Sequence, residues 1–272
     1  MSVNFRPLVA RRPRAFVAVN GPDAEALLQR VLSNDVAPLA PGDACDALLL
    51  TNKARVIAPL RVLRRGADDF LLLTEPDLGE VLLRQLLRFR LAAKAAVERE
   101  EHESVVVLGA GGPPGGALAL STDEYGVPAF ELIDGEPPAD TVEASDDELE
   151  LLRIRARTPR WGREIDGRVL PAEAGLVERA VSLTKGCFPG QEPIARLHYR
   201  GHANRGLRLL ELGGGETPGY DADVRLGDKV VGRVTSAAAS GSGTVLALAY
   251  VRREVPADAE LTVSGRAARP LR

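Results

Sequence analysis

The stretch KGCFPGQEPIAR, residues 185–196, holds one cysteine between two glycines and a proline. Glycine and proline so close together predict a tight turn that holds the Cys187 thiol in a defined position. Lys185 and Arg196 would favour the thiolate over the thiol, and a helix that begins near Gln191 would act in the same direction. The alternative is that Cys187 is a small buried hydrophobe, which is the commonest fate of a lone cysteine.

The segments upstream of this stretch predict alternating strands and helices. Residues 44–50 and 55–63 predict two strands, and Pro59 would put the second at a sheet edge or a bulge. We expect one helix after residues 20–23, with Ala26, Leu27 and Val31 as its apolar stripe, and a second helix capped by Thr74, with a stripe of Leu78, Val81, Leu82 and Leu86. Further strands are predicted at 69–73, 95–99 and 104–108.

The middle of the chain is acidic. Residues 131–150 contain nine acidic residues and no basic one, which predicts a solvated loop with an acidic linker near 134–147. A capping box, Ser145 with Glu148, then predicts a helix that continues to about Arg157. The glycine-rich segment 109–116 has no Lys-Ser/Thr pair and precedes no helix, so it predicts a flexible hairpin or linker rather than a phosphate-binding loop.

From about residue 201 the sequence changes to short alternating segments separated by glycine-rich turns. This pattern predicts an all-β module of roughly 70 residues, either a small barrel or a sandwich. The chain is therefore expected to divide into an α+β body, residues 1–200, and a C-terminal β-domain, residues 201–272.

Residues 185–196 closely resemble the K-G-C-[Y/F]-x-G-Q-E signature of the YgfZ family, relatives of the glycine-cleavage T-protein. Residues 27–62, 153–176 and 232–251 resemble other blocks of that family in the expected order, so the resemblance covers nearly the whole chain. Phenylalanine replaces the commoner tyrosine of the signature. The signature residues beside the cysteine are Gly186, Phe188, Gly190, Gln191 and Glu192.

The resemblance implies an α+β fold of the T-protein type: two mixed α/β subdomains and a C-terminal β-barrel, around a central channel for tetrahydrofolate. It also implies a role in assembling or repairing iron-sulfur clusters in other proteins, with effects on enzymes that modify tRNA. The partners would be iron-sulfur client proteins or assembly factors. Whether the chain itself catalyses a reaction is left open.

Folate recognition makes chemical demands that can be assigned to residues. A pterin presents a 2-amino group and N3–H side by side, a donor pair that one carboxylate can accept. Glu173 is our first choice and Glu164 the second, although either could be a surface acid instead. The glutamyl tail needs an arginine fork from Arg196 or Arg205, and Asn52 would line the cavity.

Two roles for Cys187 are open. Its thiolate could bind an iron-sulfur fragment or form a mixed disulfide with a client, with Lys185 assisting. Alternatively, the cysteine only shapes the turn, and folate binding does the regulatory work.

Two other function classes are weaker. Aminomethyl transfer, the T-protein reaction, needs an acidic pair where this chain has Ala58 and Pro59, which cannot transfer a proton. A hydrolase dyad of Cys187 with His198 or His202 has no residue pattern for an oxyanion hole or for an acid that orients the histidine.

Composition limits the remaining choices. The chain has 272 residues, 45% hydrophobic and 27% charged, so it can bury a hydrophobic core without a metal ion or a disulfide bond. Its net charge of −3 excludes a strongly basic protein that coats nucleic acid. The basic cluster in residues 196–208 has only Tyr199 for base stacking, so direct nucleic-acid binding is the weaker interpretation. Two distant cysteines, no secretion signal and no long apolar stretch predict a reducing, cytoplasmic setting without a membrane span.

Overall fold

The computed structural model describes residues 6–241 and 243–271, and its contacts group the chain into two compact units. Unit 1 comprises the chain up to Thr122 together with Val127–Glu143 and Leu176–Arg196. Unit 2 comprises Asp123–Gly126, Ala144–Gly175 and the chain from Leu197 onward. Residues 144–175 therefore group with the barrel, and the division by contacts does not follow a single boundary at residue 200.

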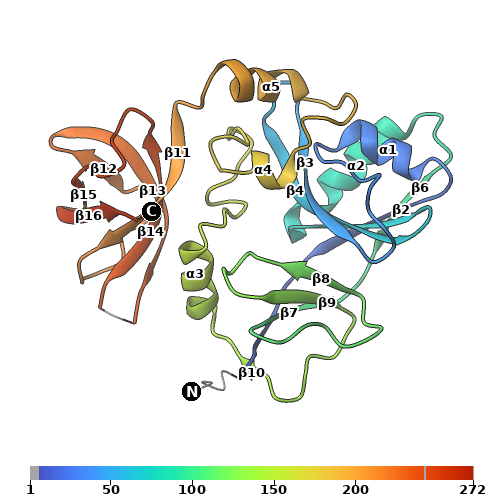
Figure 1. Cartoon of the computed structure of the whole chain (residues 1–272), viewed down its shortest axis with the longest axis horizontal. Coiled ribbons are helices and arrows are strands. Elements are labelled where there is room, and N and C mark those ends of the chain that lie inside the picture. The colour runs from blue at the N-terminus through green and yellow to red at the C-terminus, as the bar shows by residue number, and fades with distance from the viewer. Residues whose placement is uncertain (1–5, 242, 272) are drawn as a thin grey trace. The chain divides into compact units, whose positions relative to one another are not determined.

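One sheet of unit 1 is antiparallel and has the strand order β3-β4-β5-β2-β6 (Figure 1). The strands are β2 (Ala15–Asn20), β3 (Ala44–Leu50), β4 (Val56–Gly66), β5 (Asp69–Thr74) and β6 (Ala96–Glu100). The strands predicted at 44–50, 55–63, 69–73 and 95–99 are thus confirmed.

Two details of this sheet differ from expectation. β4 lies inside the sheet, but Pro59 pairs only with Leu48 of β3, because pairing with β5 begins at Leu60. At Pro59 itself, β4 is therefore paired on one side only, as in an edge strand, although β4 as a whole is not an edge strand. Thr74 ends β5, and its hydroxyl donates to the Pro59 carbonyl oxygen at 2.7 Å, so the predicted N-cap role is wrong.

The first two helices of unit 1 are amphipathic. α1 (Ala24–Val31) buries Ala24, Leu27, Leu28 and Val31, whereas Ala26 is exposed, which corrects the predicted stripe. After a short 3-10 helix, η1 (Pro76–Leu78), α2 (Gly79–Arg90) buries Gly79, Leu82 and Leu86. A one-turn helix, α4 (Val177–Ala180), contacts β3.

The second sheet of unit 1 has the order β10-β1-β7-β9-β8. Its strands are β1 (Leu8–Arg11), β7 (Ser104–Leu108), β8 (Ala119–Thr122), β9 (Ala129–Ile133) and β10 (Val142–Glu143). The glycine-rich segment 109–116 joins β7 to β8. The two sheets of unit 1 share an apolar core made by Phe16, Leu63, Leu71, Leu73, Leu120 and Ile133.

The solvated loop predicted for residues 131–150 is wrong for its first residues, which belong to β9. Glu131 lies in the middle of β9 and is only 2% exposed. The guanidinium of Arg14 donates to both of its carboxylate oxygens, at 3.0 and 3.1 Å, and Ser104 donates a third hydrogen bond at 2.7 Å. A buried charge is tolerated here because it is paired and fully hydrogen-bonded.

His102 links the end of β6 to the end of β9. Its Nδ1 lies 2.6 Å from Asp134 Oδ2 and its Nε2 lies 2.7 Å from Glu100 Oε2. Burial opposes the charge on the imidazole, but the hydrogen bonds that these two carboxylates accept outweigh it and raise the pKa of His102 above the usual value. Arg65 and His102 together hold the pKa of Glu100 down at about 2, so that carboxylate stays ionised near neutral pH.

The His102→Gln variant is expected to lose stability in a pH-dependent way. A raised folded-state pKa contributes stability that is fully present below the unfolded value of about 6.5 and is lost as pH rises through the folded value. The variant should therefore be less stable than the parent chain by about 1 kcal/mol at pH 6, with the difference shrinking at higher pH. Urea unfolding at pH 6 and pH 9 measures this, and an equal difference at both values would show that the imidazole charge contributes nothing.

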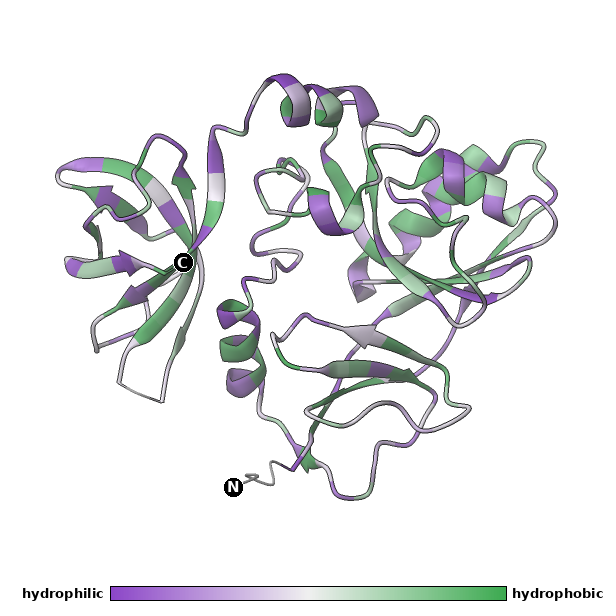
Figure 2. Cartoon of the chain, in the orientation of Figure 1, coloured by the Kyte–Doolittle hydropathy of each residue, from purple (hydrophilic) through white to green (hydrophobic). Residues whose placement is uncertain are grey.

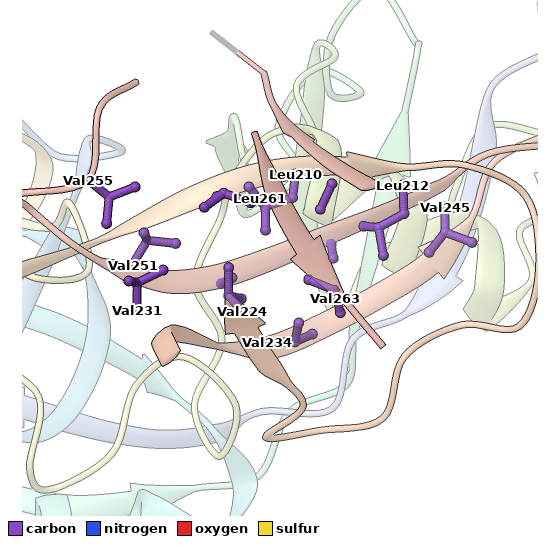
Figure 3. Packing of buried hydrophobic residues seen from close by; sticks show 13 residues of the cluster. Leu210, Leu212, Val224, Val231, Val234, Val245, Val251, Val255, Leu261 and Val263 are labelled. Carbon is purple, nitrogen blue, oxygen red and sulfur yellow. The ribbon is translucent and has the colours of Figure 1, made fainter. Parts of the chain in front are cut away.

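Unit 2 is a closed barrel with one helix packed on it (Figure 1). Its strands run in the order β11-β14-β13-β12-β15-β16, and β16 pairs with β11 to close the ring. The strands are β11 (Arg205–Leu212), β12 (Asp223–Leu226), β13 (Lys229–Ala239), β14 (Val245–Arg252), β15 (Leu261–Val263) and β16 (Arg266–Pro270). The barrel is filled by small aliphatic side chains, among them Leu210, Val224, Val234, Val251 and Val263 (Figure 3).

α3 (Asp146–Arg155) begins with the predicted capping box. Ser145 Oγ accepts the Glu148 N–H at 3.2 Å, and the Glu148 carboxylate accepts the Ser145 N–H at 2.9 Å. Hydrophilic and hydrophobic residues alternate along the helix (Figure 2), and Ile154 packs on Leu209, Leu246 and Leu248 of the barrel. In the described part of the chain, no helix combines the length and the apolar character needed to cross a membrane.

Candidate functional site

The signature stretch, residues 185–196, lies in unit 1 and forms a loop followed by the first part of a helix. The helix α5 (Gln191–Arg200) begins at Gln191, as predicted. Phe188 is buried at 7% exposure and anchors the loop, whereas Gly186, Cys187 and Glu192 are exposed. The exposed thiol excludes the alternative in which Cys187 is a buried hydrophobe.

Gly190 fixes this loop on the turn between β3 and β4. Its φ is +85°, and a Cβ atom there would lie 2.7 Å from the Thr51 carbonyl oxygen and 3.0 Å from Ala54 Cα. Only glycine fits so close an approach of two backbones. The turn is closed by the Ala54 N–H, which donates to Thr51 O at 2.9 Å, and it carries the exposed Asn52. Unit 1 thus brings Asn52 and the Cys187 loop together.

Lys185 has different partners from those expected. Its ammonium donates to the carbonyl oxygens of Leu32 at 2.8 Å and Asn34 at 2.7 Å, just beyond the end of α1. Burial lowers the pKa of Lys185 to about 8, against the opposing effect of Asp35. The Lys185 ammonium therefore binds backbone carbonyl groups. These contacts give no support to the prediction that Lys185 stabilises a Cys187 thiolate.

Ser33 is a residue that the sequence did not single out. It is fully buried, donates from Oγ to Ala180 O at 2.6 Å and accepts the Leu48 N–H at 2.8 Å. Its carbonyl accepts the Ser182 N–H at 2.9 Å. These partners are 15 to 149 positions away in sequence, so no local pattern could have indicated them.

The predicted pterin carboxylate, Glu173, lies in unit 2 and pairs with Arg205. Arg205 Nε and Nη2 donate to its two carboxylate oxygens at 3.0 and 3.2 Å, and the Leu170 N–H donates to Oε2 at 3.1 Å. The hydrogen bonds that Arg205 donates to Glu173 raise the pKa of Arg205, whose guanidinium also lies 4.6 Å from the Tyr250 ring centroid. The two residues predicted for opposite ends of a folate thus contact each other.

Glu173 and Arg205 border a cavity of about 730 Å³ in unit 2. This volume lies within the range of small-molecule sites. The other lining residues are His202, Asn204, Arg252, Arg253 and Glu254. The lining therefore holds two carboxylates, which can accept a donor pair, and three arginines, which can bind carboxylates.

Glu164, the second choice for the pterin, has other partners. Its side chain is fully buried and accepts from Arg153 at 3.0 Å, from the Arg160 N–H at 3.0 Å and from Ser236 Oγ at 2.7 Å. The Tyr250 hydroxyl donates to its backbone carbonyl at 2.8 Å. These contacts join residues 153–164 to the barrel, so we assign Glu164 a structural role.

The residues of the basic cluster lie on different elements. Arg196, His198 and Arg200 lie exposed on α5, and the His198 ring contacts that of Tyr199 edge-on at 4.9 Å. Arg205 lies on β11 instead. Arg196 is exposed to solvent. Its predicted role in binding the glutamyl tail stays a prediction.

Comparison with known proteins gives two kinds of result. No protein-family model matches the chain. The tRNA-modifying protein YgfZ of Edwardsiella ictaluri is 29% identical over an alignment that covers 91% of this chain and 85% of that protein. YgfZ of Serratia proteamaculans is 26% identical over 94% of this chain and 87% of its own length. The resemblance to the YgfZ family is confirmed.

The fold has a solved counterpart. The glycine cleavage system aminomethyltransferase T of Bartonella henselae superposes with a TM-score of 0.85, covering 98% of this chain and 85% of that chain at 18% identity. The predicted α+β fold of the T-protein type, with its C-terminal barrel, is confirmed. At this identity the likeness concerns the fold alone.

Proposed function

We propose that this YgfZ relative is a tetrahydrofolate-binding accessory protein that assists iron-sulfur cluster assembly or repair in other proteins, including enzymes that modify tRNA. Similarity to YgfZ proteins named as tRNA-modifying, over 91% and 94% of the chain, supports the tRNA link. The observation that carries the proposal is the signature loop: Gly190 packs it on the Asn52 turn and leaves Cys187 exposed.

In this proposal, the exposed thiol of Cys187 contacts the iron-sulfur client proteins. Thiolates are the preferred protein ligands of iron-sulfur clusters and the attacking groups in thiol exchange. The second cysteine is not equivalent, because burial raises the pKa of Cys45 to about 12. A reducing compartment such as the cytoplasm would keep the Cys187 thiol available.

Tetrahydrofolate supplies a carrier for one-carbon units, and the residues of unit 2 fit its binding groups. A carboxylate offers about four acceptor positions, of which Arg205 and the Leu170 N–H use three on Glu173. A pterin donor pair therefore has to displace Arg205 from at least one oxygen. Arg205 has that freedom because its side chain is 41% exposed.

Glu173→Gln is expected to weaken tetrahydrofolate binding by about 10- to 100-fold, because a charge-assisted hydrogen bond of a shielded carboxylate contributes roughly 1.5–3 kcal/mol. Calorimetric titration measures the affinity. The matched control is Glu254→Gln, since Glu254 borders the same cavity but is 62% exposed and pairs with Lys229. An affinity within twofold of the parent chain for Glu173→Gln would rule out the pterin assignment.

A further inference from the structure

The loop that carries Cys187 is joined to residues 32–34 by a set of hydrogen bonds within unit 1. Ser33 Oγ donates to Ala180 O, and the Ser182 N–H donates to Ser33 O. Farther along the loop, the Lys185 ammonium donates to the carbonyl oxygens on either side of Ser33. Leu32 and Ser33 are fully buried, so the loop is held against the interior of the unit.

The geometry around Lys185 suits an ammonium better than a guanidinium. One nitrogen reaches two carbonyl oxygens that are two residues apart, at 2.8 and 2.7 Å. An ammonium carries its three donors on one atom, whereas a guanidinium spreads its donors over a longer planar fork. The ring of Phe188 is centred 5.5 Å from Nζ, within the range of a cation–π contact.

The composition of the chain points the same way. Of 35 basic residues other than histidine, 4 are lysines and hence 31 are arginines, so a surface cation in this chain is usually arginine. Lys53, Lys94 and Lys229 are exposed, whereas Lys185 is partly buried. The structure describes all four lysines, and only Lys185 has both a shielded ammonium and backbone acceptors.

We propose that Lys185 is a positioning residue: its ammonium clamps the loop to the carbonyl groups of Leu32 and Asn34 and so fixes where the Cys187 thiol is presented. The role rests on the proposed function in one respect, since it matters to clients only if the exposed thiol acts on them. The clamp itself depends on the shape of an ammonium and on its hydrogen bonds. Arginine, despite its equal charge, cannot replace lysine here.

The test compares Lys185→Arg and Lys185→Met in the free protein. Hydrogen exchange should be at least tenfold faster in both variants at the amides of Ser182 and Lys185, which donate to Ser33 O and Ser182 Oγ in the native loop. Iodoacetamide alkylation of Cys187, read by mass spectrometry at pH 7, should differ less than twofold between the two variants. Lys53→Arg, on the exposed β3–β4 turn, is the matched control and should leave both readouts unchanged.

A role through charge alone predicts a different pattern. Lys185→Arg would then keep the parent rates of exchange and alkylation, and Lys185→Met alone would alkylate more slowly. That result, or parent-like exchange in both variants, would overturn the clamp. Amides of β14 in unit 2, which should exchange at the parent rate, report that the variants are folded. Both readouts are taken on the free protein, without tetrahydrofolate. A failure to bind tetrahydrofolate would therefore overturn the proposed function and leave the clamp intact.

Discussion

Glu164→Ala is expected to lower the free energy of unfolding of unit 2 by about 3–5 kcal/mol, because it breaks a buried ion pair. Arg153 is 7% exposed on its side chain and would keep only Glu150 as a carboxylate partner. The Arg160 N–H and the Ser236 hydroxyl would also lose their acceptor. Urea unfolding followed by the fluorescence of Trp161, the single tryptophan of the chain, measures the effect in the unit concerned.

Asp166 provides the matched control for this prediction. It lies two positions away and pairs with Arg168, whose side chain is 85% exposed. Exposed ion pairs contribute at most about 1 kcal/mol, so Asp166→Ala should change the stability far less. If Glu164→Ala kept the parent stability but lost tetrahydrofolate binding, Glu164 would be a ligand-binding residue and our structural assignment would be wrong.

Gly190→Ala is expected to destabilise unit 1 by about 2–4 kcal/mol. A non-glycine residue at a φ of +85° adds roughly 1–3 kcal/mol of strain, and the new methyl group would press on the Thr51 carbonyl oxygen from 2.7 Å. The loop should therefore move off the Asn52 turn. Urea unfolding monitored by circular dichroism measures the loss of stability, and faster hydrogen exchange at the Ala54 amide reports the local displacement.

The neighbouring glycine of the signature serves as the control. Gly186 does not have a positive φ, and a Cβ atom there would meet no atom within 4 Å. Gly186→Ala should therefore be close to neutral, within about 0.5 kcal/mol. Equal losses for the two alanine variants would mean that the close approach of Gly190 to Thr51 does not hold the loop.

The sequence predicted the elements of the fold well where local patterns decide them. The strand predicted at residues 44–50 and the capping box of Ser145 both correspond to elements of the structure. It failed where the deciding partner is distant. Glu131 sits in an acidic run typical of a solvated loop, but Arg14, 117 positions away, makes its burial possible. Thr74 has the chemistry of a helix cap, but the Pro59 carbonyl takes its hydroxyl instead.

The candidate site was predicted in part for the same reason. The signature revealed the turn at Gly190 and the helix that begins at Gln191, since glycine, proline and polar residues act locally. It did not reveal that Lys185 binds the carbonyl groups of Leu32 and Asn34, or that Glu173 and Arg205 pair with each other. Such contacts depend on the packing of each unit.

Cells that lack this protein test the central claim most directly, through the activities of iron-sulfur enzymes that modify tRNA. We predict that these activities fall and that the parent chain and Cys45→Ser restore them, whereas Cys187→Ser does not. Normal activities in the deficient cells would contradict the account, even if the purified protein bound tetrahydrofolate, and would leave a folate store or a one-carbon transferase.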